Sequence, residues 1–237
     1  MVSSPYFNNL KCLNLEDNSI DDEGCKILAE SENMRNLTSL KLSVKHLRNV
    51  TLDGLSYVFS STHLSNLQSL FLKGFDLKGL ELNDNKFGDM LMKSSFRNNL
   101  KSVTLSYCDV DTLNLHHIAQ LDQLRKLKIV HYHTIASVCE CIASSPHMSN
   151  LTSLKLVCGV TDSDCLHLAD SVYLTQLTTL NVSSNQIGLD GCEYFANSPN
   201  FPNLTILELG DNKKDHEGLK MIRDSPYFQH LKPFNKM

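Results

Sequence analysis

Apolar and polar residues alternate along the chain in a short pattern that recurs, and its clearest copy opens the stretch 177–199. Leu177, Leu180 and Val182 are separated by polar residues, so a strand there buries one side and leaves the other in water. Asn185 follows where the chain must leave the strand and turn. This stretch therefore predicts a half-buried strand that ends in a tight turn.

The second half of the same stretch predicts a helix. Tyr194, Phe195 and Ala196 form its apolar side. The dipeptide Ser198-Pro199 ends it, because proline lacks an N–H group and disfavours a helical conformation in the residue before it. One strand and one helix cannot bury both of their faces, so neighbouring units must stack.

The strand pattern occurs eight times, at intervals of 24 to 33 residues, and a ninth, incomplete copy starts at Leu231. The predicted core triplets are Leu10/Leu13/Leu15, Leu37/Leu40/Leu42, Leu67/Leu70/Leu72, Leu100/Val103/Leu105, Leu124/Leu127/Ile129, Leu151/Leu154/Leu156, Leu177/Leu180/Val182 and Leu204/Leu207/Leu209. A repeat array grows by addition, so all 237 residues are expected to form a single domain, 1–237.

Three phrases carry a resemblance to a known family: Leu13-x-Leu15-x-x-Asn18, Val182-x-x-Asn185-x-Ile187-Gly188 and Leu209-x-x-Asn212. The chain resembles a leucine-rich repeat protein of the ribonuclease-inhibitor-like type over essentially its whole length. The resemblance implies an α/β leucine-rich-repeat solenoid (a horseshoe) with a concave parallel β-sheet, convex helices and about eight repeats of ~27 residues. It also implies that the turn asparagine bonds free backbone groups, so that stacked copies form a ladder.

The middle of the chain departs from this pattern. Residues 67–100 form the longest repeat and contain two candidate strands, Leu70–Leu72 and Leu80–Leu82. Their spacing is too short for two coils, which need about 20 residues each. Either Leu70–Leu72 is the strand and 73–89 is a lengthened loop, or the reverse holds; the spacing of the neighbouring repeats favours the first. Three turns that lack the asparagine are expected to be looser or differently bonded, at Lys45, Cys108 and Gly159.

Composition and charge exclude several classes of protein. The net charge is −4, which gives no overall basic balance for nucleic acid. The N-terminal residues lack the charged and apolar regions of a signal peptide. Eight cysteines without a secretory signal indicate free thiols in a reducing compartment, so we expect a cytoplasmic (intracellular) protein. The motifs of common enzymes are absent, so we expect no enzyme activity, no catalytic residues and no cofactor.

Two groups of residues contain the side chains needed for thiol chemistry or metal binding. Cys25, Cys165 and Cys192 share one repeat position at the start of a helix, where a small apolar side chain suits packing against the sheet. The segment from His131 to Cys141 contains two histidines and two cysteines, which zinc could use. The histidines are expected beyond a strand and the cysteines on the next helix, where residues two apart do not share a face, so no metal site is predicted.

The concave face is the predicted binding site, because side chains between the core leucines must point outward there. Its middle is basic with two aromatic residues, whereas Glu16, Asp17, Glu208 and Asp211 lie toward the ends. The predicted partner-binding residues are Lys41, Phe71, Lys73, Thr104, Tyr107, Arg125, Lys126, Lys128 and Lys155. Such a patch fits a protein partner with an acidic surface. The alternative for this face is a solvated surface that keeps the protein soluble.

The resemblance therefore implies a non-enzymatic protein–protein recognition scaffold. The alternatives are the substrate-recognition segment of a larger effector or ubiquitin-ligase assembly, and an RNA or polyanion binder, which the acidic net charge disfavours. Both ends of the chain carry the same phase of the repeat, Ser4-Pro5-Tyr6-Phe7 and Ser225-Pro226-Tyr227-Phe228. This favours either a segment of a longer array or an N-terminal edge that meets another chain.

Overall fold

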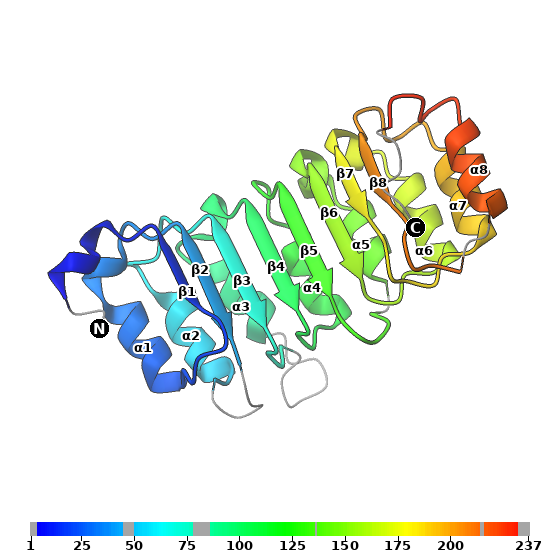
Figure 1. The fold of residues 1–237 in the computed structure, drawn as a ribbon. Coiled ribbons are helices and arrows are strands. Elements are labelled where there is room, and N and C mark those ends of the chain that lie inside the picture. Colours follow the sequence, from blue (N-terminus) through cyan, green and yellow to red (C-terminus); the bar gives the residue numbers. More distant parts are fainter. Residues whose placement is uncertain (1–3, 45–49, 78–85, 136, 214–215, 232–237) are drawn as a thin grey trace. The chain divides into compact units, whose positions relative to one another are not determined.

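The computed structural model describes residues 4–44, 50–77, 86–135, 137–213 and 216–231. The chain divides into two compact units, Met1–Gln123 and Leu124–Met237. In each unit, parallel strands lie side by side and helices cover one face of the sheet (Figure 1). We call the face without helices the open face. The prediction of a single domain over 1–237 stays a prediction.

Unit 1 contains four strands that pair in sequence order, and the helices that follow them pack on one another. Its elements are η1 (Pro5–Asn9), β1 (Cys12–Leu15), α1 (Asp22–Glu30), η2 (Glu32–Met34), β2 (Ser39–Ser43), α2 (Leu52–Ser60), β3 (Ser69–Lys73), α3 (Lys86–Lys93), η3 (Arg97–Asn99), β4 (Ser102–Ser106) and α4 (Thr112–Ile118), where η marks a short 3₁₀ helix.

Unit 2 has the same organisation. Its elements are β5 (Lys126–Val130), α5 (Val138–Ala143), η4 (Pro146–Asn150), β6 (Ser153–Val157), α6 (Asp162–Ala169), η5 (Leu174–Gln176), β7 (Thr179–Asn181), α7 (Leu189–Ala196), β8 (Ile206–Glu208) and α8 (His216–Asp224). The predicted strand-and-helix alternation is thus confirmed in both units. The predicted ninth copy, which starts at Leu231, lies outside the described residues from 232 onward.

The core consists of the predicted apolar positions. The leucines of the second to eighth triplets are at most 5% exposed. Those of the first triplet, Leu10, Leu13 and Leu15, are only partly buried. The alternation of apolar and polar residues therefore predicted correctly which side of each strand faces the helices.

The structure decides between the two candidate strands of the long repeat. β3 covers Leu70–Leu72 and pairs with both β2 and β4. Leu80–Leu82 lies outside the described residues. The predicted loop boundaries, 73–89, are wrong at both ends, because Lys73 still pairs in the sheet and α3 begins at Lys86.

In unit 2, two turn asparagines, Asn185 and Asn212, each join their coil to the one before it. The side-chain oxygen of Asn185 accepts hydrogen bonds from the backbone N–H groups of Cys158 and Val160, at 3.1 and 3.0 Å. Its amide nitrogen donates to the carbonyl of Leu156 at 2.7 Å. Asn212 repeats the arrangement one coil later, since it accepts from Ile187 N–H and donates to the carbonyl of Val182. The predicted ladder is present between these coils.

In unit 1, Cys108 occupies the position of the turn asparagine and provides only part of its bonding. Its Sγ donates to the carbonyl of Leu72 at 3.3 Å, which is the contact that Asn185 makes to Leu156. A thiol is a weak donor and cannot match the two N–H contacts of an amide oxygen. The expectation of a differently bonded turn is confirmed here. In unit 2, Gly159 adopts the left-handed conformation, with φ at 78°. Lys45 lies outside the described residues.

Two further ladders explain sequence features that recur. In the phrase Asn-Leu-Thr, the Asn36 amide donates to Asn8 and the Thr38 hydroxyl to Lys11, both backbone carbonyls of the previous coil. At the ends of helices, a serine donates to a carbonyl one coil earlier, as Ser198 does to Ala169. Ser61, Ser171 and Ser225 make the equivalent contact. The serine ladder was not predicted; its signal was a serine that recurs just after the predicted helices, and of these four serines only Ser198 and Ser225 are followed by proline.

Candidate functional site

The outward side chains of unit 1 form a row across its open face. Strand register places Asn14, Lys41, Phe71 and Thr104 beside one another on β1 to β4. Of the predicted binding residues, this brings together Lys41, Phe71 and Thr104, and Lys73 lies two residues after Phe71 on β3. Tyr107 is in the turn after β4, 37% exposed and in the left-handed conformation, with φ at 55°.

Two predicted binding residues of this face, Lys41 and Lys73, are paired with carboxylates, whereas Lys101, just before β4, donates a hydrogen bond to the side-chain oxygen of Gln68 at 3.2 Å. Lys41 Nζ lies 3.2 Å from the Glu16 carboxylate and 5.3 Å from the centre of the Phe71 ring. Lys73 Nζ lies 3.2 Å from the Asp17 carboxylate. The acidic residues that the sequence placed at the end of the face thus reach the lysines of the next strands. The open face of unit 1 carries ion pairs and an aromatic ring, with little excess positive charge.

The open face of unit 2 places two lysines directly side by side. Lys128 on β5 is in register with Lys155 on β6, and Lys126 is in register with Ser153. Arg125 precedes β5 and is exposed. Within the described ranges, no carboxylate lies within the 4.0 Å ion-pair limit of these four side chains. Four predicted binding residues therefore form a cationic group on this face: Arg125, Lys126, Lys128 and Lys155.

The row that contains the lysine pair changes character toward β8. Asn181 on β7 follows Lys155 in register, and Glu208 on β8 follows Asn181. The Asn181 amide donates a hydrogen bond to the Glu208 carboxylate. The positive charge is therefore confined to β5 and β6, and the same row ends in a negative charge.

Two valines extend the lysine pair along the strands. Val130 and Val157 are in register, two residues after Lys128 and Lys155 respectively, and both are partly exposed. Tyr132, just beyond β5, is 80% exposed. Sequence reasoning overlooked these apolar residues, although the outward alternation that selected the lysines also selects both valines.

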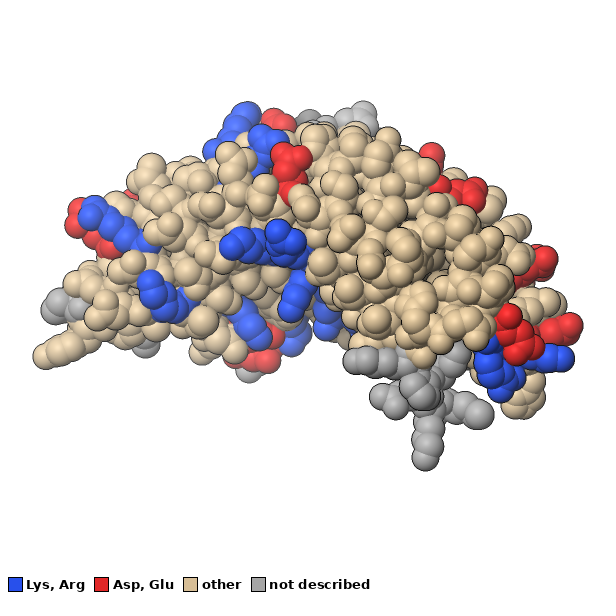
Figure 2. All heavy atoms as spheres, turned by 90° about the horizontal axis from the view of Figure 1, so that it is seen from above, with Lys and Arg blue, Asp and Glu red and all other residues tan. Residues whose placement is uncertain are grey.

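Charges of both signs occur on the face drawn in Figure 2. Some groups of Lys and Arg side chains there have Asp or Glu side chains beside them, and others do not. This agrees with the net charge of −4 and leaves no uniformly basic surface in that view. In the described part of the chain, no helix is both long and apolar enough to cross a membrane.

None of the eight cysteines, all of which lie in the described ranges, forms a disulfide; Cys12 is exposed and the other seven are buried. Burial is the main cause that raises the pKa of Cys25 to about 12 and that of Cys158 to about 12. Burial also raises the pKa of Cys165. Because the thiolate is the reactive form, these thiols are inert at neutral pH. This supports the predicted packing role of Cys25 and Cys165.

The histidine and cysteine segment is divided in space as expected. His133 is exposed and His131 is partly buried, with ring centres 5.5 Å apart, whereas Cys139 and Cys141 are buried on α5. Among the described residues, no group of three or more His, Cys, Asp or Glu side chains is placed to hold a metal ion.

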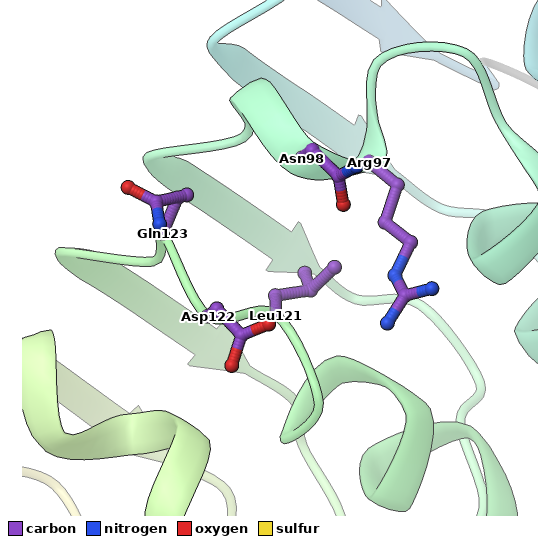
Figure 3. Close-up of a pocket in the computed structure, with 5 residues that line it drawn as sticks. All are labelled: Arg97, Asn98, Leu121, Asp122 and Gln123. Carbon is purple, nitrogen blue, oxygen red and sulfur yellow. The ribbon is translucent and has the colours of Figure 1, made fainter.

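A small pocket of unit 1 is lined by none of the predicted binding residues (Figure 3). It has a volume of about 150 Å³ and is lined by Arg97 and Asn98 of η3 and by Leu121, Asp122 and Gln123. Ligand sites for small molecules usually enclose about 300–1,000 Å³. This pocket is therefore too small and too polar to serve as the main binding site.

Comparison with known proteins supports the leucine-rich-repeat fold. A family model described as a leucine-rich repeat matches residues 8–29 and 173–196. A crystal structure of an internalin, inlF, from Listeria monocytogenes matches 98% of this chain, with a TM-score of 0.52 and 18% sequence identity. The chain spans 64% of the length of that structure, and at this identity the likeness shows the fold alone. No curated protein matches the chain. The recurring strand-and-helix units, the two matched segments and the likeness to the internalin structure together show a leucine-rich-repeat fold.

Proposed function

We propose that the chain is a non-enzymatic recognition scaffold that binds a protein with an acidic surface on the open face of unit 2. The leucine-rich repeat fold is generally used for protein–protein recognition. The binding residues in this proposal are Arg125, Lys126, Lys128 and Lys155. Lys41 and Lys73 are not part of the proposed acidic contact, because carboxylates already pair with them.

The lysine pair is the observation that carries the proposal. Like charges directly opposite each other on neighbouring strands destabilise a sheet. Lys128 and Lys155 are in this arrangement, with no carboxylate within ion-pair distance in the described ranges. A carboxylate of a partner would relieve the repulsion. The arrangement therefore favours binding over solubility alone as the role of this face.

The backbone of unit 2 suits rigid binding. Asn185 and Asn212 fix successive turns, and serine hydroxyls fix the ends of the helices. A surface that is already ordered loses little conformational freedom when a partner binds. Opposite charge on the partner then increases the association rate and selects the register of the complex.

Crosslinking in the source cell tests this function. The variant Lys128→Glu/Lys155→Glu should reduce the captured amount of the wild-type partner at least tenfold, since each reversal replaces attraction by repulsion. Lys213→Glu/Lys220→Glu is the matched control, because both residues are exposed in unit 2, outside β5 and β6, and the charge changes equally. Equal capture by both variants would contradict the proposal. Capture of RNA with steep salt dependence would replace it by polyanion binding.

We also propose an intracellular location. The eight free cysteines support it, because exposed and buried thiols persist in reducing compartments. Labelling of thiols immediately after cell lysis should find all eight reduced. An intermolecular disulfide through the exposed Cys12 in that experiment would contradict this location.

A further inference from the structure

The outward residues of β5 and β6 form three successive pairs of different chemistry. The first pair is Lys126 with Ser153, the second is Lys128 with Lys155, and the third is Val130 with Val157. Each pair is two residues along the strand from the next. Along the open face of β5 and β6, the first pair therefore carries one positive charge, the second carries two, and the third is apolar.

We propose that the partner presents an extended segment with the pattern acidic–x–acidic–x–apolar, which lies along β5 and β6 on the open face of unit 2. This inference rests on the proposed function and specifies its partner. The two acidic side chains contact Lys126 and the Lys128/Lys155 pair. The apolar side chain covers Val130 and Val157.

The geometry of extended chains supports this match. Residues in a strand advance about 3.3 Å, so residues two apart on one face are separated by nearly 7 Å in both the sheet and the bound segment. Neighbouring strands are about 4.8 Å apart, so one carboxylate can lie between Lys128 and Lys155 and reach both. An α-helical segment would present residues three and four apart and would not follow these steps.

The neighbours of the three pairs set the limits of the segment. Across the strands, Glu208 lies in the same row as the lysine pair, two strands beyond β6, and would repel an acidic chain placed there. Along the strands, the exposed Tyr132 lies past the valines and extends the apolar end. An acidic segment is therefore favoured on β5 and β6, with its apolar residue toward Tyr132.

The valine pair distinguishes this partner from a simple polyanion. RNA or polyphosphate would use the cationic group, but it would gain nothing from Val130 and Val157. Those two side chains are already partly exposed, whereas the residues that alternate with the outward ones along β5 and β6 are buried. An apolar side chain placed on them removes apolar surface from water and adds affinity that does not depend on salt.

Two synthetic peptides of identical composition test the pattern. The matched peptide is acetyl-Ser-Glu-Ser-Glu-Ser-Leu-Ser-amide, and its isomer, acetyl-Ser-Glu-Ser-Glu-Leu-Ser-Ser-amide, moves the leucine to the opposite side of the extended chain. NMR titration of the isotope-labelled full chain reports both affinity and position. We expect the matched peptide to bind about fivefold more tightly, from partial burial of one leucine. Its resonance shifts should centre on β5 and β6.

Variants of the chain complete the test. Val157→Ser should remove the difference between the peptides, whereas Val157→Thr, which keeps the shape, should retain part of it. Lys128→Glu/Lys155→Glu should abolish binding of both peptides. Equal affinity of the isomers for the wild type, or shifts outside β5 and β6, would overturn the pattern. If partner capture in cells still depends on Lys128 and Lys155, the proposed function stands even though the acidic–x–acidic–x–apolar pattern has failed. If capture is unaffected by the lysine variant, the proposed function itself fails.

Discussion

The open faces of the two units both carry lysines, but their surroundings differ. In unit 1, Lys41 and Lys73 each lie 3.2 Å from a carboxylate. In unit 2, Lys128 and Lys155 lie side by side, with no such partner in the described ranges. The number of lysines on a face therefore does not give its charge. The residues in neighbouring register and just beyond each strand decide whether the face can attract an anion.

The turns of the two units differ in a parallel way. Asn185 in unit 2 both accepts from and donates to the previous coil, whereas Cys108 in unit 1 contributes a thiol donor. Unit 2 thus combines a strongly bonded turn with two adjacent lysines that have no carboxylate partner among the described residues. Unit 1 combines a weaker turn with a neutralised face. Four substitutions sharpen or break this comparison, beginning with the largest expected effect.

Asn185→Ala should lower the free energy of unfolding by about 3 kcal/mol, because two buried N–H groups and several carbonyls lose their partner. Urea denaturation followed by circular dichroism measures the change. Asn185→Asp separates the two halves of the contact, since it keeps the acceptor for Cys158 and Val160 but replaces the donor to the Leu156 carbonyl by a carboxylate oxygen. An effect below about 1 kcal/mol for the alanine variant would show that water replaces the ladder.

Cys108→Ala should lower the free energy of unfolding by about 1 kcal/mol, from the loss of a weak donor and a small apolar group. The same urea experiment gives the value. A loss as large as that of Asn185→Ala would remove the distinction between the two turns.

Lys155→Thr should raise the free energy of unfolding by about 0.5 kcal/mol, because it removes the repulsion with Lys128 and introduces a residue that suits strands. Thermal unfolding at low salt is the sensitive measurement, since salt screens the repulsion. A stability gain accompanied by weaker binding of the acidic partner would mark the pair as functional. A loss of stability would show that Lys155 supports the fold.

Glu16→Gln should change the free energy of unfolding by less than about 0.5 kcal/mol, because the pair with Lys41 is partly exposed to solvent. Its informative readout is binding of an acidic probe, poly-L-glutamate, which should increase slightly as Lys41 is released. An increase to the level of unit 2 would mean that Glu16 alone masks the face of unit 1.

The sequence predicted the strands and the buried side of each, since the Leu-x-x-Leu-x-Leu alternation depends on one strand and its own core. It predicted the outward positions of Lys41, Lys128 and Lys155 for the same reason. It did not predict the ion pairs to Glu16 and Asp17. These carboxylates lie just after β1, and the lysines that reach them are 25 residues later (Lys41) and 56 residues later (Lys73) in the sequence. The loop boundaries 73–89 were also wrong, because the phrase near Leu80 resembles a strand while residues 86–93 form a helix.

Neutralisation of each lysine pair tests the central claim most directly. Lys128→Gln/Lys155→Gln and Lys41→Gln/Lys73→Gln change the net charge equally, and both are titrated with poly-L-glutamate at about 0.15 M salt, where charges more than about 8 Å apart are largely screened. The predicted result is an affinity at least about tenfold lower for the first variant and within about twofold of wild type for the second. Equal losses in the two variants, or a larger loss in the second, would contradict the assignment of recognition to the open face of unit 2.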